Sequence, residues 1–318
     1  MYITSKKIKG RKYRYIAKSI RLPDGKVKTI QKLIKDREKP LAELEEEFQD
    51  YFIKQEKRLY SDYARSVYET DSVINQEQMR EVESMKVDYR YVNKRLTKSQ
   101  LKDLFDRFTA NFTYESNAIE GNSLTLKDVS IVMFDNATVE GKDLREIYET
   151  RNSREVIDLM LKKKFDITHN DIKKVHKLLM QDIDTTLGYK KLPNYLLGRN
   201  VETTPPERVE GEITKLIEWY KENRKSEHPL KISALFHGKF EKIHPFEDGN
   251  GRVGRVLSNA ILINDGYPPL IIRKSQRESY LKVLESSDTG AQINLERFFL
   301  DKYKKTFRNF FKVYAQYI

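Results

Sequence analysis

The amino-acid sequence predicts a mainly α-helical protein with a small basic β element at its N-terminus. Apolar residues recur at helical spacing along most of the 318 residues. Segments such as Thr97-Lys-Ser-Gln and Thr125-Leu-Lys-Asp resemble capping boxes, and apolar residues at helical spacing follow them. Strand-like alternation, in contrast, is confined to residues 12–34. No internal repeat interrupts this pattern.

Residues 12–34 are predicted to form strand, turn and strand. The strands are KYRYIAKSI and KVKTIQKLI, and RLPDG between them contains the Pro-Asp-Gly that favours a tight turn. Pro40 then begins a long helix, whose apolar residues recur as far as Tyr63. A further interruption comes at residues 192–209, where Asn, Gly and the pair Pro205-Pro206 predict an extended loop or hairpin.

We therefore expect three parts. Residues 1–39 form a basic β-hairpin, 40–95 a helical connector or recognition region, and 96–318 the main helical domain.

The net charge of +12 is concentrated in residues 1–39. This segment holds 14 Lys or Arg against three acidic residues, a balance of +11, which leaves +1 for the remaining chain. A basic segment of this kind suits nucleic acid or an acidic protein surface. Charged strand edges also prevent aggregation, and no motif that reads bases is present. Both interpretations of the segment stay open.

Composition also excludes several classes of site. The chain has no Cys, which rules out disulfides, thiolate chemistry and Cys-ligated zinc, and none of its five His forms an HExxH pair. The first residues lack the apolar core of a signal peptide, and no segment approaches the ~18 apolar residues of a membrane span. We therefore expect a soluble cytoplasmic protein without a membrane partner.

The segment HPFEDGNGRVGR, residues 244–255, connects two apolar helical patterns and is predicted to be a helix–loop–helix turn. Its GNGR stretch opens the second helix, where unsatisfied backbone N–H groups and the helix dipole favour an anion. Gly249 and Gly251 let that backbone approach a phosphate closely, because neither has a Cβ.

The side chains of this segment fit phosphate chemistry as well. Arg252 and Arg255 lie three residues apart on one helix face and can reach the same polyphosphate. Asp248 is a suitable Mg²⁺ ligand beside them. His244, at the end of the preceding helix, is placed to take a proton from an attacking hydroxyl. The segment therefore predicts phosphate-ester chemistry on a nucleotide.

The pattern H-P-F-x-D-G-N-G-R-x-x-R resembles the signature of Fic domain proteins, and every motif position is matched. The resemblance extends over about residues 97–300 and implies a Fic-fold helical bundle with a small β-hairpin flap. It implies that AMP moves from ATP to a Ser, Thr or Tyr hydroxyl of a target protein, with His244 as general base. Asp248 then binds Mg²⁺, and the phosphates are held by Gly249, Asn250, Gly251, Arg252 and Arg255. Doc-like kinases replace the GNGR stretch, so its presence favours AMP transfer.

Other positions also resemble the family. NYLLGR resembles the flap that pins a target segment by strand-like pairing, which assigns this role to Tyr195, Leu196, Leu197 and Gly198. Tyr280 matches a position near the adenine. Ser287 departs from the family, because relatives often carry Asn there, and this leaves nucleotide selectivity open.

A second motif precedes the first. Phe105, Phe108 and Phe112 make a helix amphipathic, Gly121 terminates it, and Glu120 lies in its last turn, where the helix dipole disfavours a carboxylate. Ser116-x-x-x-Glu120-Gly121 resembles the inhibitory motif of the family, Ser/Thr-x-x-x-Glu-Gly/Asn. The resemblance implies an inhibitory helix at about 103–121, in which Glu120 pairs with Arg255 and Ser116 contributes to the same site.

Three interpretations follow. The first is a self-restrained protein adenylyltransferase whose targets include a second copy of the chain, and whose Glu120 also suits the reverse removal of AMP. The second transfers another phosphate-linked group on the same scaffold. The third is a nucleotide-gated binding protein associated with nucleic acid or ribosomes through residues 1–39. A homo-oligomer is compatible with each of them.

Overall fold

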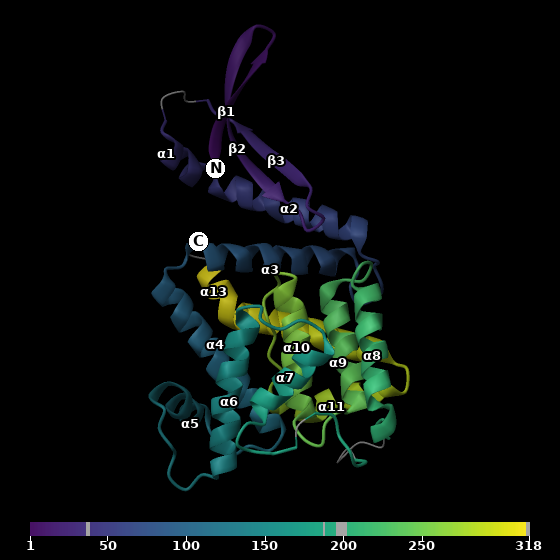
Figure 1. Ribbon diagram of the computed structural model, residues 1–318. Coiled ribbons are helices and arrows are strands. Elements are labelled where there is room, and N and C mark those ends of the chain that lie inside the picture. The colour runs from purple at the N-terminus through teal and green to yellow at the C-terminus, as the bar shows by residue number, and fades with distance from the viewer. Residues whose placement is uncertain (36–38, 187, 195–201, 316–318) are drawn as a thin grey trace.

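The computed structural model describes residues 1–35, 39–186, 188–194 and 202–315. A small antiparallel sheet stands at one end of the molecule, and helices build the rest, which confirms the mainly α-helical prediction (Figure 1). The strands are β1 (Tyr2–Ile8), β2 (Arg11–Arg21) and β3 (Val27–Leu33). The first helices are α1 (Leu41–Glu47), α2 (Gln49–Val67), α3 (Gln76–Arg95), α4 (Lys98–Ile119), α5 (Leu126–Ser130) and α6 (Leu144–Leu161). They are followed by α7 (His169–Leu179), α8 (Pro206–Asn223), α9 (Pro229–Ile243), α10 (Asn250–Asn264), α11 (Arg277–Asp288), α12 (Gln292–Thr306) and α13 (Lys312–Ala315). Short π-helical turns, η1 (Ile131–Asp135) and η3 (Phe307–Phe311), and a 3₁₀ turn, η2 (Lys274–Gln276), complete the elements.

The N-terminal sheet has three strands in the order β1-β2-β3, so the predicted hairpin was incomplete. Strand β1 pairs with β2 from Tyr2 opposite Ala17 to Ile8 opposite Arg11. A two-residue turn connects them, with positive φ at Lys9 (48°) and Gly10 (81°), as a tight hairpin turn requires. Because β1 is an edge strand with no fully buried residue, its sequence lacks the apolar alternation that reveals a strand.

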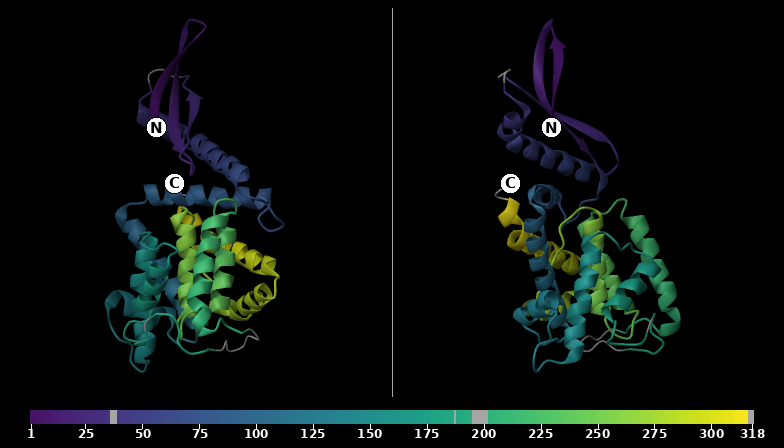
Figure 2. Two further views of the ribbon diagram at one scale, coloured as in Figure 1. Left: turned by 45° about the vertical axis from the view of Figure 1, so that its right-hand side comes forward. Right: turned by 60° about the vertical axis from the view of Figure 1, so that its left-hand side comes forward.

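The predicted long helix after Pro40 is interrupted at Phe48, which separates α1 from α2. Both helices cover the sheet, and together they enclose a separate N-terminal core. Its buried members are Ile16, Ile20, Ile30, Ile34, Leu44, Phe52, Tyr60 and Val87. Val87 comes from α3, whose other buried apolar residues belong to the larger core. We call β1–β3, α1 and α2 the N-terminal unit, and the helices from α4 onward the helical body. Helix α3 therefore lies between these two parts, with α2 against it (Figure 2).

The helical body is built around α9 and α10, which pack against each other. Helix α10 also contacts α4, α6 and α7, so the helices that carry the two motifs meet there. The predicted capping boxes at Thr97 and Thr125 are confirmed, and the Thr168 side chain also caps a helix by accepting from the N–H of Asp171. These caps fix where α4, α5 and α7 begin.

The predicted loop at 192–209 is shorter than expected, because α8 already begins at Pro206. Proline suits a first helical position, where its missing N–H costs no hydrogen bond. The flap residues Tyr195, Leu196, Leu197 and Gly198 lie outside the described residues. Within the described ranges, no helix is long and apolar enough to cross a membrane.

Candidate active site

The segment 244–255 folds as a tight loop between α9 and α10, which we call the nucleotide loop. His244 ends α9 in the left-handed conformation (φ 51°, ψ 62°), and Gly249 precedes α10 with φ 79°. Phe246 is fully buried and stacks on His176 of α7, with the ring centroids 3.8 Å apart. The loop is thus anchored in the core by its phenylalanine.

Asn250 closes the nucleotide loop upon itself. Its Oδ1 accepts from the N–H of Phe246 at 2.9 Å, and its Nδ2 donates to the Phe246 carbonyl at 2.8 Å. The side chain is therefore buried and committed to the backbone of its own loop. Asn250 can therefore offer a ligand its backbone N–H, while its amide side chain is already hydrogen-bonded within the loop, and its contact with a phosphate stays a prediction.

Glu120 lies directly over the start of α10. It caps the C-terminus of α4, and Gly121 follows with φ 108°, as the predicted helix end requires. A Cβ added to Gly251 would lie only 2.2 Å from Glu120 Oε1, which means that the carboxylate rests on the glycine backbone. The Glu120 carboxylate therefore occupies the position at the helix N-terminus where the sequence predicted a phosphate.

Arg255 is held by the same turn of α4. Its Nη2 lies 2.7 Å from Glu120 Oε1 and donates to the Ser116 carbonyl at 2.9 Å, while Nε donates to Ser116 Oγ at 2.9 Å. The guanidinium is 3% exposed. Burial alone lowers the pKa of Arg255, but attraction to Glu120, its hydrogen bond to Glu120 and attraction to other acidic neighbours together outweigh burial and leave the pKa raised. The structure thus brings together Ser116, Glu120 and Arg255 from the two predicted motifs.

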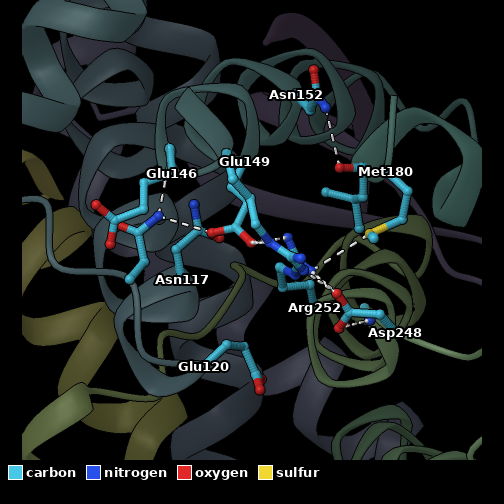
Figure 3. A network of polar contacts seen from close by, with 12 residues as sticks. Asn117, Glu120, Glu146, Glu149, Asn152, Met180, Asp248 and Arg252 are labelled. Atoms are coloured by element: carbon cyan, nitrogen blue, oxygen red, sulfur yellow. Dashed lines mark hydrogen bonds and ion pairs between the residues drawn. The ribbon is translucent and has the colours of Figure 1, made fainter. Parts of the chain in front are cut away.

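Arg252 faces a different carboxylate, which the sequence did not reveal (Figure 3). Its Nη1 lies 3.2 Å from Glu149 of α6, and its Nη2 lies 3.5 Å from Asp248. The side chain is 3% exposed, and its Nε has no hydrogen-bond partner among the described residues. A buried donor of this kind requires an acceptor, and a phosphate oxygen would supply one.

Glu149 connects Arg252 to the turn that carries Glu120. Its Oε2 accepts from Asn122 Nδ2 at 2.9 Å, and Asn122 follows Glu120 by two residues (Figure 3). Arg145, one turn earlier on α6, lies 3.4 Å from Glu149 Oε1 and forms a second ion pair with Asp248. The sequence contains one signal for this network. Glu149 and Asn152 are polar residues on the buried side of α6, where an amphipathic helix usually has apolar residues.

Asp248 is the candidate magnesium ligand and has a half-exposed side chain. Oδ1 accepts from the N–H of Gly249 at 2.6 Å, and Oδ2 faces Arg145 and Arg252. No group of three or more metal-ligating side chains occurs in the described part of the chain. One exposed carboxylate still fits Mg²⁺, since this ion is usually bound through one or two carboxylates, substrate phosphates and water.

Tyr280 lies in the interior rather than on an open wall. Its side chain is 2% exposed, and its hydroxyl hydrogen-bonds to Nε2 of the fully buried His237. Burial is the largest cause that raises the pKa of Tyr280, so the phenol stays protonated. His237 therefore has a packing and hydrogen-bonding role, and a place for Tyr280 beside an adenine stays a prediction.

The described residues on either side of the predicted flap form a network with the nucleotide loop. Lys190 donates its N–H to the Pro245 carbonyl at 2.8 Å, and its ammonium bonds to Asn194 Oδ1 (2.7 Å) and Thr203 Oγ1 (3.0 Å). Asn194 Nδ2 also donates to the Phe246 carbonyl at 2.8 Å. Burial lowers the pKa of Lys190 to about 8. Lys190 and Asn194 thus contact the loop that carries His244 directly, and Thr203 contacts it through these two side chains.

Comparisons with known proteins agree with this geometry. The Fic/DOC family model matches residues 166–262. The protein adenylyltransferase Fic of Drosophila virilis is 34% identical over 202 residues, which is 61% of this chain and 41% of that protein; the Drosophila melanogaster protein of the same name is 33% identical. The chain thus spans about two fifths of the length of these curated relatives.

Among solved structures, a Fic family protein from Desulfovibrio desulfuricans G20 is 28% identical with a TM-score of 0.61, and the match covers 76% of this chain and 75% of that one. A Fic domain containing signaling protein from Bacteroides thetaiotaomicron VPI-5482 is 24% identical with a TM-score of 0.67, over 74% of this chain and 96% of that one, and shares the fold. The family match includes α7, α9, most of α10 and the entire nucleotide loop. Residues 166–262 of this chain are therefore a domain of the Fic/DOC family.

Proposed function

We propose that this chain is a protein adenylyltransferase that transfers AMP from ATP to a Ser, Thr or Tyr hydroxyl of a target protein. The observation that carries the proposal is the pair of buried guanidinium groups, Arg252 and Arg255, at the N-terminus of α10. Two cations, free backbone N–H groups and a helix dipole converge there, and a polyphosphate would satisfy all of them. The relatives named protein adenylyltransferase support the same assignment.

The reaction needs one proton transfer and one displacement at phosphorus. His244 takes the proton of the target hydroxyl, whose oxygen then attacks the α-phosphorus of ATP. The bond between the α-phosphorus and its bridging oxygen to the β-phosphate breaks, and pyrophosphate leaves with the electron pair. Arg252, Arg255 and the first N–H groups of α10 hold the phosphates. Mg²⁺ on Asp248 supplies charge neutralisation of the triphosphate when bound.

Glu120 is proposed to restrain this reaction. Its carboxylate lies over Gly251 and on Arg255, so it competes with a phosphate for both space and charge. The same carboxylate suits a second activity, in which it orients a water molecule for removal of AMP from the target. Transfer of a different phosphate-linked group also remains compatible with the site, since Ser287 departs from the usual Asn.

The test follows the phosphate that reaches protein. Wild type, Glu120→Gly and Glu120→Gly/His244→Ala are each incubated with candidate target proteins, Mg²⁺ and ATP labelled at the α- or the γ-phosphate. We expect α-label on protein mainly with Glu120→Gly and none with the double variant. Label from the γ-phosphate alone would instead identify a kinase, and label that persists without His244 would remove the assigned base.

A further inference from the structure

A large groove lies between the N-terminal unit and the helical body, at the far end of α10 from the nucleotide loop. Its volume is about 1150 Å³. The turn after β2, α3, the start of α4 and the residues that follow α10 contribute to its walls. Helix α10 runs from Asn250 in the candidate active site to Asn264 in the groove wall, so the two sites are separated by the length of this helix, about 22 Å.

The groove is strongly cationic. Nine Lys or Arg and three Asp line it within the described part of the chain. Lys94 and Lys98, on either side of the α3–α4 connection, are exposed, and among the described residues neither forms an ion pair. Apolar side chains such as Leu101, Phe105 and Leu161 lie between the charges. The wall therefore combines positive charge with apolar surface, in contrast to an ordinary solvated helix face.

One cation in the groove is nearly buried. Lys86 is 8% exposed, and its ammonium lies 3.9 Å from the ring centroid of Tyr267 and 5.7 Å from that of Tyr60. Among described residues it forms no hydrogen bond or ion pair, although Glu83 and Asp265 attract it from farther away. Burial lowers the pKa of Lys86. A desolvated ammonium that faces a groove is well placed to bind an anion.

Three features indicate what kind of anionic ligand fits the groove. The volume exceeds the about 300–1000 Å³ typical of small-molecule sites, which favours a chain segment over a metabolite. The apolar side chains between the cations suit a ligand in which apolar groups alternate with negative charges. The carboxylates of Asp106 and Asp158 in the wall oppose the continuous phosphates of a nucleic-acid strand.

We propose that this groove binds an acidic peptide segment of a partner protein, with one carboxylate on Lys86 and apolar side chains against Phe105 and its neighbours. A bound segment contacts both the N-terminal unit, through Leu22, and the helical body, through Phe105. The proposal does not depend on AMP transfer, because the groove shares no lining residue with the nucleotide loop.

The test uses the full chain and a fluorescein-labelled peptide that repeats Glu-Glu-Leu, with binding followed by fluorescence anisotropy at low and high salt. The double variant Lys94→Glu/Lys98→Glu should weaken binding at least about tenfold, and added salt should weaken binding to the wild type. The matched control is Lys221→Glu/Lys225→Glu, two exposed lysines that do not line the groove, and it should bind as wild type does.

Lys86→Met tests the buried cation separately and should also weaken binding about tenfold, with circular dichroism as the check of the fold. If Lys86→Met does not fold, the Lys94→Glu/Lys98→Glu variant still tests whether the groove binds the peptide. Equal binding by wild type and the Lys94→Glu/Lys98→Glu variant would overturn the proposal. Tighter binding of an oligo-dT strand of matching length than of the peptide would overturn it as well and would favour nucleic acid.

Discussion

Replacing Glu120 by Gln removes one negative charge from the candidate active site and keeps the size of the side chain. In the structure this carboxylate lies 2.7 Å from Arg255 and rests on Gly251. Ser116 still holds the guanidinium through its hydroxyl and its carbonyl, so the arginine should stay in place. We therefore expect Glu120→Gln to leave Arg255 positioned and available to a phosphate.

The magnitude follows from the contact that is lost. A hydrogen bond between charged groups contributes about 1.5–3 kcal/mol. The Glu120 side chain is 40% exposed, so water replaces part of the interaction when the pair opens, and about 1.5–2 kcal/mol is the appropriate part of that range. Because 1.4 kcal/mol corresponds to a factor of ten, AMP transfer at low ATP should be about 10- to 30-fold faster.

The assay is the initial rate of α-label incorporation into protein at ATP concentrations below KM, for wild type, Glu120→Gln and Glu120→Gly. Asp103→Asn is the matched control, since it neutralises an exposed carboxylate on the same helix outside the site. Equal rates for wild type and both Glu120 variants would refute the restraint. A faster rate for Gly but not for Gln would show that space, rather than charge, limits the reaction.

Three further predictions concern stability. Glu149→Gln removes the buried carboxylate that pairs with Arg252, whose guanidinium then retains only Asp248. This change should lower the free energy of unfolding by about 3 kcal/mol in urea titrations. The control Glu155→Gln, at an exposed position of the same helix, should have no effect. Asn250→Ala leaves one loop N–H buried without an acceptor and should cost about 2 kcal/mol by the same measurement; an unchanged urea midpoint would contradict the role of Asn250 as the loop clamp. Burial lowers the pKa of His176 from 6.5 to about 4, so the unfolded chain binds a proton in this range before the folded protein does. Stability should therefore be complete above pH 6.5 and fall by about 3 kcal/mol as the pH decreases to 4, and His176→Gln should remove this part of the pH dependence.

The sequence was most informative where local physical chemistry decides the structure. Helix caps such as Thr97, the glycine that ends α4, and the glycine-rich start of α10 all occur where their residue types require. Strand β1 was missed because an edge strand without a buried face carries no alternation. The break at Phe48 was missed because the apolar spacing continues through it.

The residues of the candidate site also differ in whether local sequence patterns reveal them. Residues of the nucleotide loop could be found from their own segment, and the turn with Glu120 could be found by resemblance. Glu149 and Asn122 could not, because their importance comes from contacts between α6 and the end of α4 that no local pattern records. The clamping role of the Asn250 side chain could not be predicted from the sequence either, because its hydrogen bonds to the backbone of Phe246 depend on the folded shape of the loop.

Ser116 and Glu120 contact Arg255 in different ways, and this difference bears on how the basal rate could change during evolution. Ser116 holds the arginine, and in the proposed function only Glu120 would oppose a phosphate, so orientation and the proposed restraint belong to different side chains. Position 120 is the C-cap residue of α4 and its side chain is 40% exposed, so substitutions there should change stability less than substitutions in the core. Asp, Gln or Gly at this one position should therefore give a graded series of basal rates on an unchanged scaffold, and selection can adjust the rate one substitution at a time.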